Sequence, residues 1–135
     1  MPIISTKGNY AIGALFELAK NYPDNLLQIK QINALTNIPK NYLEQILYQL
    51  KNSGFVHSVR GANGGYKLSK SPKEILISDV LVALEGNFHK VSVSSENTIL
   101  EQFWNGSSNE VLSIFNQPLN ILIEKWQQEV NNYTI

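Results

Sequence analysis

The spacing of apolar and polar positions predicts a mainly helical first part of the chain. Residues 10–21 are apolar on almost every side, which indicates a buried helix. Two further helices are expected over 28–35 and 39–53, joined by the short turn 36–38. The second of these has an apolar stripe and, opposite it, a long polar face rich in amides. The apolar stripe consists of Tyr42, Leu43, Ile46, Leu47 and Leu50.

The period of the pattern then changes from about 3.6 residues to 2, which predicts a β-hairpin. Residues 55–59 and 66–68 read as its two strands, and the glycine-rich segment 60–65 connects them. Asn63 and Gly64 are expected to form the turn, because both tolerate positive φ.

Helical patterns return in the last part of the chain. One helix is expected from Ser78, as its N-cap, to the residue before Gly86. After a polar loop, one helical phase continues across residues 105–106, which favours a single long helix. A capping box at Ser107 would instead begin a new helix there. A last helix carries Leu119, Leu122, Ile123, Trp126 and Val130.

Composition excludes several classes of protein. The 135 residues suit one domain with an appended element, and they include no cysteine. This removes disulfides, thiolate metal sites and cysteine nucleophiles. The two histidines, His57 and His89, have no carboxylate or serine placed beside them by local spacing, so we expect neither an enzyme nor a bound metal or cofactor. No signal peptide and no membrane-spanning apolar run is recognisable, which favours a cytoplasmic protein without membrane contact.

The formal net charge is zero, but the charges are unevenly distributed. Residues 1–73 carry nine basic and three acidic side chains, whereas residues 74–135 carry two and eight. A basic half favours a polyanionic partner, and chance clustering on a solvated surface is the alternative.

The order of elements is that of a winged helix-turn-helix: helix, short helix, tight turn, amide-rich helix, hairpin. The major groove of DNA admits one helix, and asparagine, glutamine and glutamate side chains pair there with base edges. Asn41, Glu44 and Gln45 are therefore the predicted base-reading residues, with an ordinary solvated face as the alternative. Three lysines are expected to contact phosphates: Lys7, Lys40 and Lys51.

The predicted hairpin tip carries Arg60, the only arginine of the chain, together with Asn63. A slim, glycine-rich tip can enter the minor groove, where arginine responds to the negative potential of narrow A·T tracts. A plain turn would explain the glycines but not the arginine beside them.

Four stretches of the chain resemble the Rrf2 family of bacterial transcription regulators. They are Ser5-Thr6-Lys7-Gly8-Asn9-Tyr10-Ala11, Asn41-Tyr42-Leu43-Glu44-Gln45-Ile46, Ser58-Val59-Arg60-Gly61-Ala62-Asn63-Gly64-Gly65-Tyr66 and Leu84-Glu85-Gly86. The resemblance implies a homodimeric winged helix-turn-helix regulator in which a long helix from each subunit crosses at the two-fold axis. It also implies base-reading roles for Asn41, Glu44 and Gln45 and a minor-groove role for Arg60.

One departure from the family's pattern bears on cofactors. Many members hold an iron–sulfur cluster through three cysteines after the Leu-Glu-Gly element, and residues 87–99 contain none. His89 alone cannot hold a cluster and is expected to be a surface-loop histidine. The chain therefore resembles the cluster-free branch of the family.

The sequence divides into a winged helix-turn-helix domain, 1–86, and a segment of loop and C-terminal dimerisation helices, 87–135. The apolar residues of the second segment have little core of their own, so a two-fold partner would cover them. The predicted dimer contacts are Phe103, Trp104, Val111, Leu112 and Phe115.

We therefore predict a DNA-binding regulator, by default a repressor, that binds an inverted repeat as a homodimer. One alternative is a winged-helix module that binds a protein and does not read DNA. The other is a regulator gated by a small metabolite or by a protein effector. The operator, the effector, the regulated genes and the choice between activation and repression do not follow from the sequence.

Overall fold

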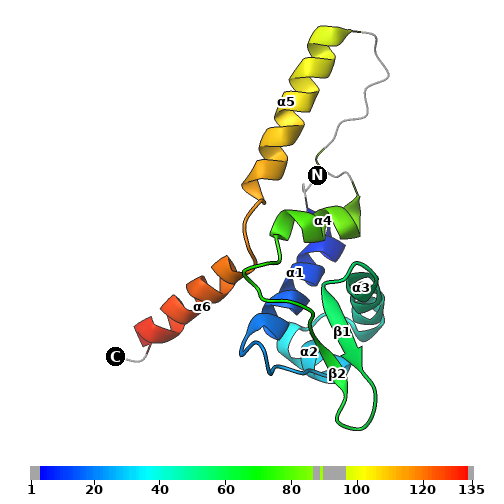
Figure 1. Cartoon of the computed structure of the whole chain (residues 1–135), viewed down its shortest axis with the longest axis vertical. Helices are drawn as coiled ribbons and strands as arrows, with labels where there is room; N and C mark the ends of the chain where they lie inside the picture. The colour runs from blue at the N-terminus through cyan, green and yellow to red at the C-terminus, as the bar shows by residue number, and fades with distance from the viewer. Residues whose placement is uncertain (1–3, 87–88, 90–96, 134–135) are drawn as a thin grey trace.

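The computed structural model describes residues 4–86, 89 and 97–133, and the described part is mainly helical with one two-stranded hairpin. Its helices are α1 (Thr6–Ala19), α2 (Ile29–Thr36), α3 (Lys40–Asn52), α4 (Ile77–Glu85), α5 (Thr98–Ile114) and α6 (Asn120–Tyr133). Its strands are β1 (Val56–Val59) and β2 (Gly65–Leu68). Helix α1 lies at the centre, with α2, α3 and α4 packed around it (Figure 1).

Helix α1 begins earlier and ends earlier than the predicted range 10–21. Its N-cap is Ser5, whose hydroxyl accepts a hydrogen bond of 3.2 Å from the backbone N–H of Gly8. At the other end, Lys20 is extended and Asn21 has a left-handed φ of 62°, which stops the helix at Ala19. The apolar face of α1 is buried as predicted.

The predicted helix–turn–helix over 28–53 is confirmed. Asn37 ends α2 in the left-handed conformation (φ 61°), and its backbone N–H donates to the carbonyl of Asn33 at 2.8 Å. The Asn33 amide in turn donates to the carbonyl of Ile38 at 2.6 Å, which fixes the entry into α3. Four of the five residues of the predicted α3 stripe are fully buried, whereas Tyr42 is 37% exposed and packs edge-on against Tyr10.

The hairpin forms in the predicted place, but the predicted turn is wrong. Strands β1 and β2 pair antiparallel from Val56 opposite Leu68 to Val59 opposite Gly65. Positive φ occurs at Gly61 and Gly65, not at Asn63 or Gly64. The tip closes through the N–H of Gly64, which donates to the Gly61 carbonyl at 3.0 Å.

The predicted N-cap of α4, Ser78, is also wrong, although the helix ends before Gly86 (φ 69°) as expected. The N–H groups of Ile77 and Ser78 donate to the carbonyls of Gln117 and Phe115, each at 2.8 Å. A segment distant in sequence therefore satisfies the first donors of the helix. Ser78 itself is buried.

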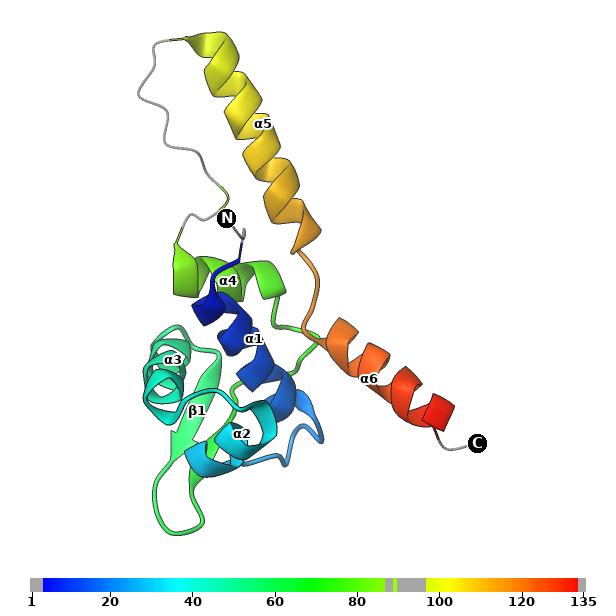
Figure 2. The same cartoon turned by 180° about the vertical axis from the view of Figure 1, so that it is seen from behind.

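The two C-terminal helices have different surroundings. Helix α5 is a single helix across Asn105 and Gly106, as favoured from the sequence, and it projects away from the other elements (Figures 1 and 2). Helix α6 instead packs on α1: Leu119 just before it is fully buried, and Trp126 stacks edge-on against Phe16. None of the described helices is long and apolar enough to cross a membrane. The predicted polar loop lies mostly outside the described residues.

Candidate nucleic-acid interface

The exposed face of α3 carries the predicted base-reading side chains. The buried stripe described above turns the opposite side of the helix to solvent, and Asn41, Glu44 and Gln45 are all exposed there. Lys40 and Lys51, at the two ends of the helix, are exposed as well. This surface presents amide, carboxylate and ammonium groups, the types that pair with base edges and phosphates in a major groove.

Lys7 joins this surface from another element. It lies in the first turn of α1, is half-buried, and lines a hollow together with four residues of α3. Those four residues are Glu44, Gln45, Tyr48 and Gln49. The structure thus brings Lys7 of α1 next to two of the predicted base-reading residues.

The position of Lys7 depends on a contact between α1 and α4. The Glu85 carboxylate accepts a hydrogen bond of 2.7 Å from the backbone N–H of Ser5, and a second one from the Ser5 hydroxyl. Gly8 makes room for this contact, because a Cβ there would lie 2.8 Å from the Glu85 carboxyl carbon. The end of α4 therefore holds the beginning of α1 in place.

The hairpin stands on the same flank as α3, and α6 leaves from the opposite flank (Figures 1 and 2). Strand β1 packs against α3. Arg60 and Asn63, the two hairpin residues predicted to contact DNA, are both exposed. The polar face of α3 and the hairpin tip are thus both free to meet one partner.

The cations of this flank are not neutralised within the described part of the chain. Residues 4–86, 89 and 97–133 contain one ion pair, between Lys20 and Glu17 at 3.0 Å. Glu44 is the only acidic residue within α3. Unpaired lysine and arginine side chains can neutralise phosphates and release their counterions.

Two residues of the hollow have no role assigned from the sequence. Tyr48 is 65% exposed, although aromatic side chains are usually covered. The Oε1 atom of Gln49 is buried without a hydrogen-bond partner. Helical spacing placed both on the polar face of α3, but their proximity to Lys7 depends on the packing of α1.

Four of the predicted dimer contacts lie on the projecting helix α5, and the fifth lies in a groove just after it. Phe103 is 59% exposed on the projecting helix, and its ring meets Trp104 edge-on at 5.0 Å. Trp104, Val111 and Leu112 are partly exposed on the same helix. Phe115 follows α5 and lines a groove beside the first residues of α1. Ile99 and Leu100, which are not among the predicted dimer contacts, are 75% and 44% exposed and extend the apolar surface of α5.

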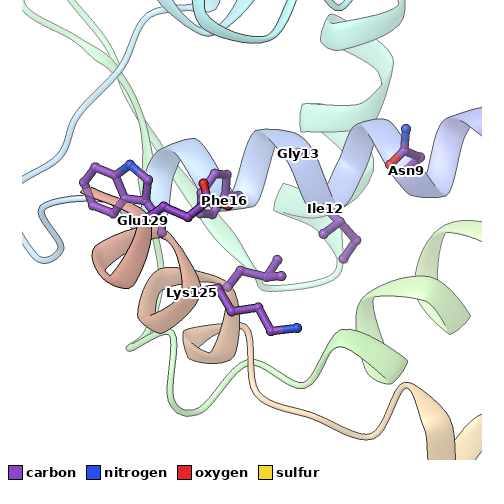
Figure 3. Close-up of a pocket in the computed structure, with 8 residues that line it drawn as sticks. Asn9, Ile12, Gly13, Phe16, Lys125 and Glu129 are labelled. Carbon is purple, nitrogen blue, oxygen red and sulfur yellow. The ribbon is translucent and has the colours of Figure 1, made fainter. Parts of the chain in front are cut away.

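A second groove runs between α1 and α6 (Figure 3). Ile12 and Phe16 of α1 line it, and a Cβ at Gly13 would meet no atom within 4 Å. Lys125 and Glu129 of α6 add one charge of each sign at its edge. The groove combines an apolar lining with a cation and an anion.

The comparisons with known proteins agree with this architecture. The model of the Rrf2 family, described as iron-dependent transcriptional regulators, matches residues 4–133. The chain belongs to the Rrf2 family. The regulator CymR of Bacillus subtilis is 38% identical over 102 residues, which are 75% of this chain and 74% of CymR. The regulator IscR of Cereibacter sphaeroides is 32% identical over 126 residues, 84% of this chain and 81% of IscR.

Solved Rrf2 structures confirm the winged-helix fold. The structure of Bacillus subtilis CymR, described as the global cysteine regulator, superposes with a TM-score of 0.82 at 34% identity. It covers 93% of this chain and 98% of CymR. The mainly helical fold with one hairpin, predicted from the sequence, is the fold of this family member.

The description of the Rrf2 family as iron-dependent raises the question whether this chain has residues that could hold iron. The sequence contains no cysteine, so it offers no thiolate for an iron–sulfur cluster. Within the described ranges, no three His, Cys, Asp or Glu residues are grouped as metal ligands. His89, expected on a surface loop, is half-buried, and its carbonyl accepts a hydrogen bond of 2.6 Å from the Ser108 hydroxyl. The residues present do not fit a cysteine-held cluster.

Proposed function

We propose that this Rrf2 protein is a sequence-specific DNA-binding regulator that acts as a homodimer without an iron–sulfur cluster. The observation that carries the proposal is that α3 and the hairpin lie on one flank (Figure 1) and that Glu44 of α3 and Arg60 of the hairpin tip are both exposed, with Lys7 beside α3. A helix for the major groove and an arginine for the minor groove are thereby available to one duplex. Repression by occlusion of a promoter is the simplest mechanism for such a protein.

The dimer is proposed on the exposure of α5. A helix with Ile99 and Phe103 more than half exposed leaves apolar area in water, and a second copy would cover it. A two-fold dimer presents two identical reading units, so its operator should be an inverted repeat. The two α3 helices are expected to lie about one turn of duplex apart, roughly 34–36 Å.

Selection of bound sequences from random duplexes by the purified protein tests this function. We expect an enriched inverted repeat, bound with an affinity that falls steeply with salt because bound counterions are released. The winged-helix module that binds only proteins predicts no enriched sequence. Assay of metal content on the same sample tests the proposed absence of a cluster.

Substituting the two principal readers is expected to weaken binding to the selected site. Glu44→Ala and Arg60→Ala should each cost about 1–3 kcal/mol and flatten the sequence preference at the positions they contact. Competition titrations against base-substituted sites measure both effects. Lys125→Ala and Glu124→Ala, which remove the same charges on α6, serve as controls and should leave the preference unchanged. Unaltered selectivity in both reader variants would contradict the assigned roles.

Gating by a small metabolite is the second candidate, and the groove between α1 and α6 is the observation that favours it (Figure 3). Its apolar lining and the opposite charges of Lys125 and Glu129 suit a small molecule with an apolar body and charged ends. Calorimetric titration of the purified protein with such metabolites tests this candidate independently of DNA.

A further inference from the structure

One side chain connects the helix-turn-helix to the tip of the hairpin. The amide of Gln28, the residue before α2, donates a hydrogen bond of 3.1 Å from Nε2 to the carbonyl of Ala62. The backbone N–H of Gln28 is engaged separately, since it donates to Oε1 of Gln31 at 2.8 Å. Gln28 therefore belongs at once to the start of α2 and to the tip of the hairpin.

The backbone beside Gln28 pairs with the same hairpin near the beginning of β2. Leu27 and Tyr66 exchange two hydrogen bonds, of 2.9 and 2.7 Å, in an isolated antiparallel bridge. Gly65 permits this approach, because a Cβ there would lie 2.5 Å from the Leu27 carbonyl oxygen. The bridge fixes the beginning of β2, but it includes none of residues 60–64.

The tip beyond this bridge has little other support. A two-stranded hairpin is only marginally stable by itself. Among the described residues, the bond from Gln28 is the single side-chain hydrogen bond that reaches residues 60–64 from outside the hairpin. Ala62, its acceptor, lies between the two exposed residues of the tip that are proposed to contact DNA, Arg60 and Asn63.

We propose that Gln28 is a positioning residue that sets the place of the Arg60 guanidinium relative to the reading face of α3. The inference rests on the proposed function. It adds a residue that acts on DNA binding through the position of Arg60 and is not itself assigned a contact with DNA. Helix α2 connects Gln28 to α3, because it begins beside Gln28 and is joined to α3 through the tight turn at Asn37. The hydrogen bond from Gln28 therefore relates the place of the hairpin tip to that of α3. A tip held at a fixed distance from α3 loses less conformational freedom when it enters the minor groove.

The variant Gln28→Glu tests the proposal with little change in size. It replaces the amide donor by an acceptor that faces the Ala62 carbonyl, so the hydrogen bond is lost. Gln31→Glu is the matched control, because it adds the same charge nearby and keeps an oxygen that accepts from the Gln28 N–H. We expect Gln28→Glu to weaken operator binding about threefold to tenfold. For Gln31→Glu we expect a change of less than about twofold.

Two readouts separate positioning from a general loss of stability. In an Arg60→Ala background, Gln28→Glu should cause no further loss, since it acts through that guanidinium. In the free protein, amide hydrogen exchange over residues 60–64 should be faster in Gln28→Glu than in the wild type, with the exchange of α3 unchanged.

Equal loss of binding in Gln28→Glu and Gln31→Glu would overturn the inference, as would a loss that adds in full to that of Arg60→Ala. Unchanged exchange at the tip in the free Gln28→Glu protein would overturn it as well. The failure of the proposed function has a different signature, because the wild type would then select no duplex. The exchange experiment needs no DNA and would still test the tether.

Discussion

Phe103→Asp is expected to convert the proposed dimer into a monomer and to weaken operator binding by about 100-fold or more. A single reading unit loses the high effective concentration that a dimer gives to its second half-site, which is worth about 10²–10⁴ in affinity. Phe103 is 59% exposed on the projecting helix α5, so a carboxylate there would be buried only in a dimer. Sedimentation measures the assembly, and titration with the selected duplex measures the affinity.

The neighbouring residue provides the control for this variant. Gln102 is also exposed on α5, and Gln102→Asp adds the same charge without removing an aromatic side chain. We expect that variant to remain dimeric. A Phe103→Asp protein that still sediments as a dimer and binds normally would show that α5 is not the interface.

Gly65→Ala is expected to lower the free energy of unfolding by about 1–3 kcal/mol, the cost of holding a side chain in a disfavoured backbone conformation. Gly65 has a φ of 152°, and its added Cβ would also press on the carbonyl of Leu27. The substitution therefore separates the hairpin from the residues before α2. Urea denaturation followed by circular dichroism measures the change.

Gly13→Ala is the matched substitution with the opposite expected sign. Gly13 lies within α1, and a Cβ there meets no atom within 4 Å. Alanine should therefore raise the free energy of unfolding by about 0.5–1 kcal/mol through its better helix propensity. A Gly65→Ala protein as stable as Gly13→Ala would contradict the account of the bridge at Leu27.

The helix-turn-helix could be predicted because its signals are local. Burial of Leu43, Ile46, Leu47 and Leu50 follows from a repeat within one helix, and the exposure of the opposite face follows from the same repeat. The hairpin strands were likewise marked by a change of period to 2. Each of these patterns is contained within a single helix or strand.

The features that the sequence could not predict depend on distant partners. Ser78 has the residue type of an N-cap, but the backbone at Gln117 satisfies the first donors of α4 instead. The hairpin turn was assigned to Asn63 and Gly64 from a local preference, whereas Gly65 adopts positive φ where Leu27 comes close. At the start of α4 and in the hairpin turn, contacts with residues distant in sequence therefore decide the backbone conformation, not the local preference of the residue types.

In the candidate site, too, some features follow from local sequence patterns and others depend on distant partners. The exposed side chains of α3 and of the hairpin were identifiable from type and spacing, and their roles in reading DNA stay predictions. The contribution of Lys7 to the hollow requires the packing of α1 on α3. The bond between Gln28 and Ala62 spans 34 positions, so no local pattern could indicate it.

The two tryptophans of the chain occupy one C-terminal helix each. Trp126 packs against Phe16 in the body, and the Lys20 ammonium lies 4.7 Å from the centre of its ring. Trp104 lies on the projecting helix, with the Phe103 ring as its aromatic neighbour. The protein thus contains two tryptophan fluorophores in separate environments. In a Trp126→Phe variant, tryptophan emission would come from α5 alone and would give an optical signal of subunit association without any attached dye.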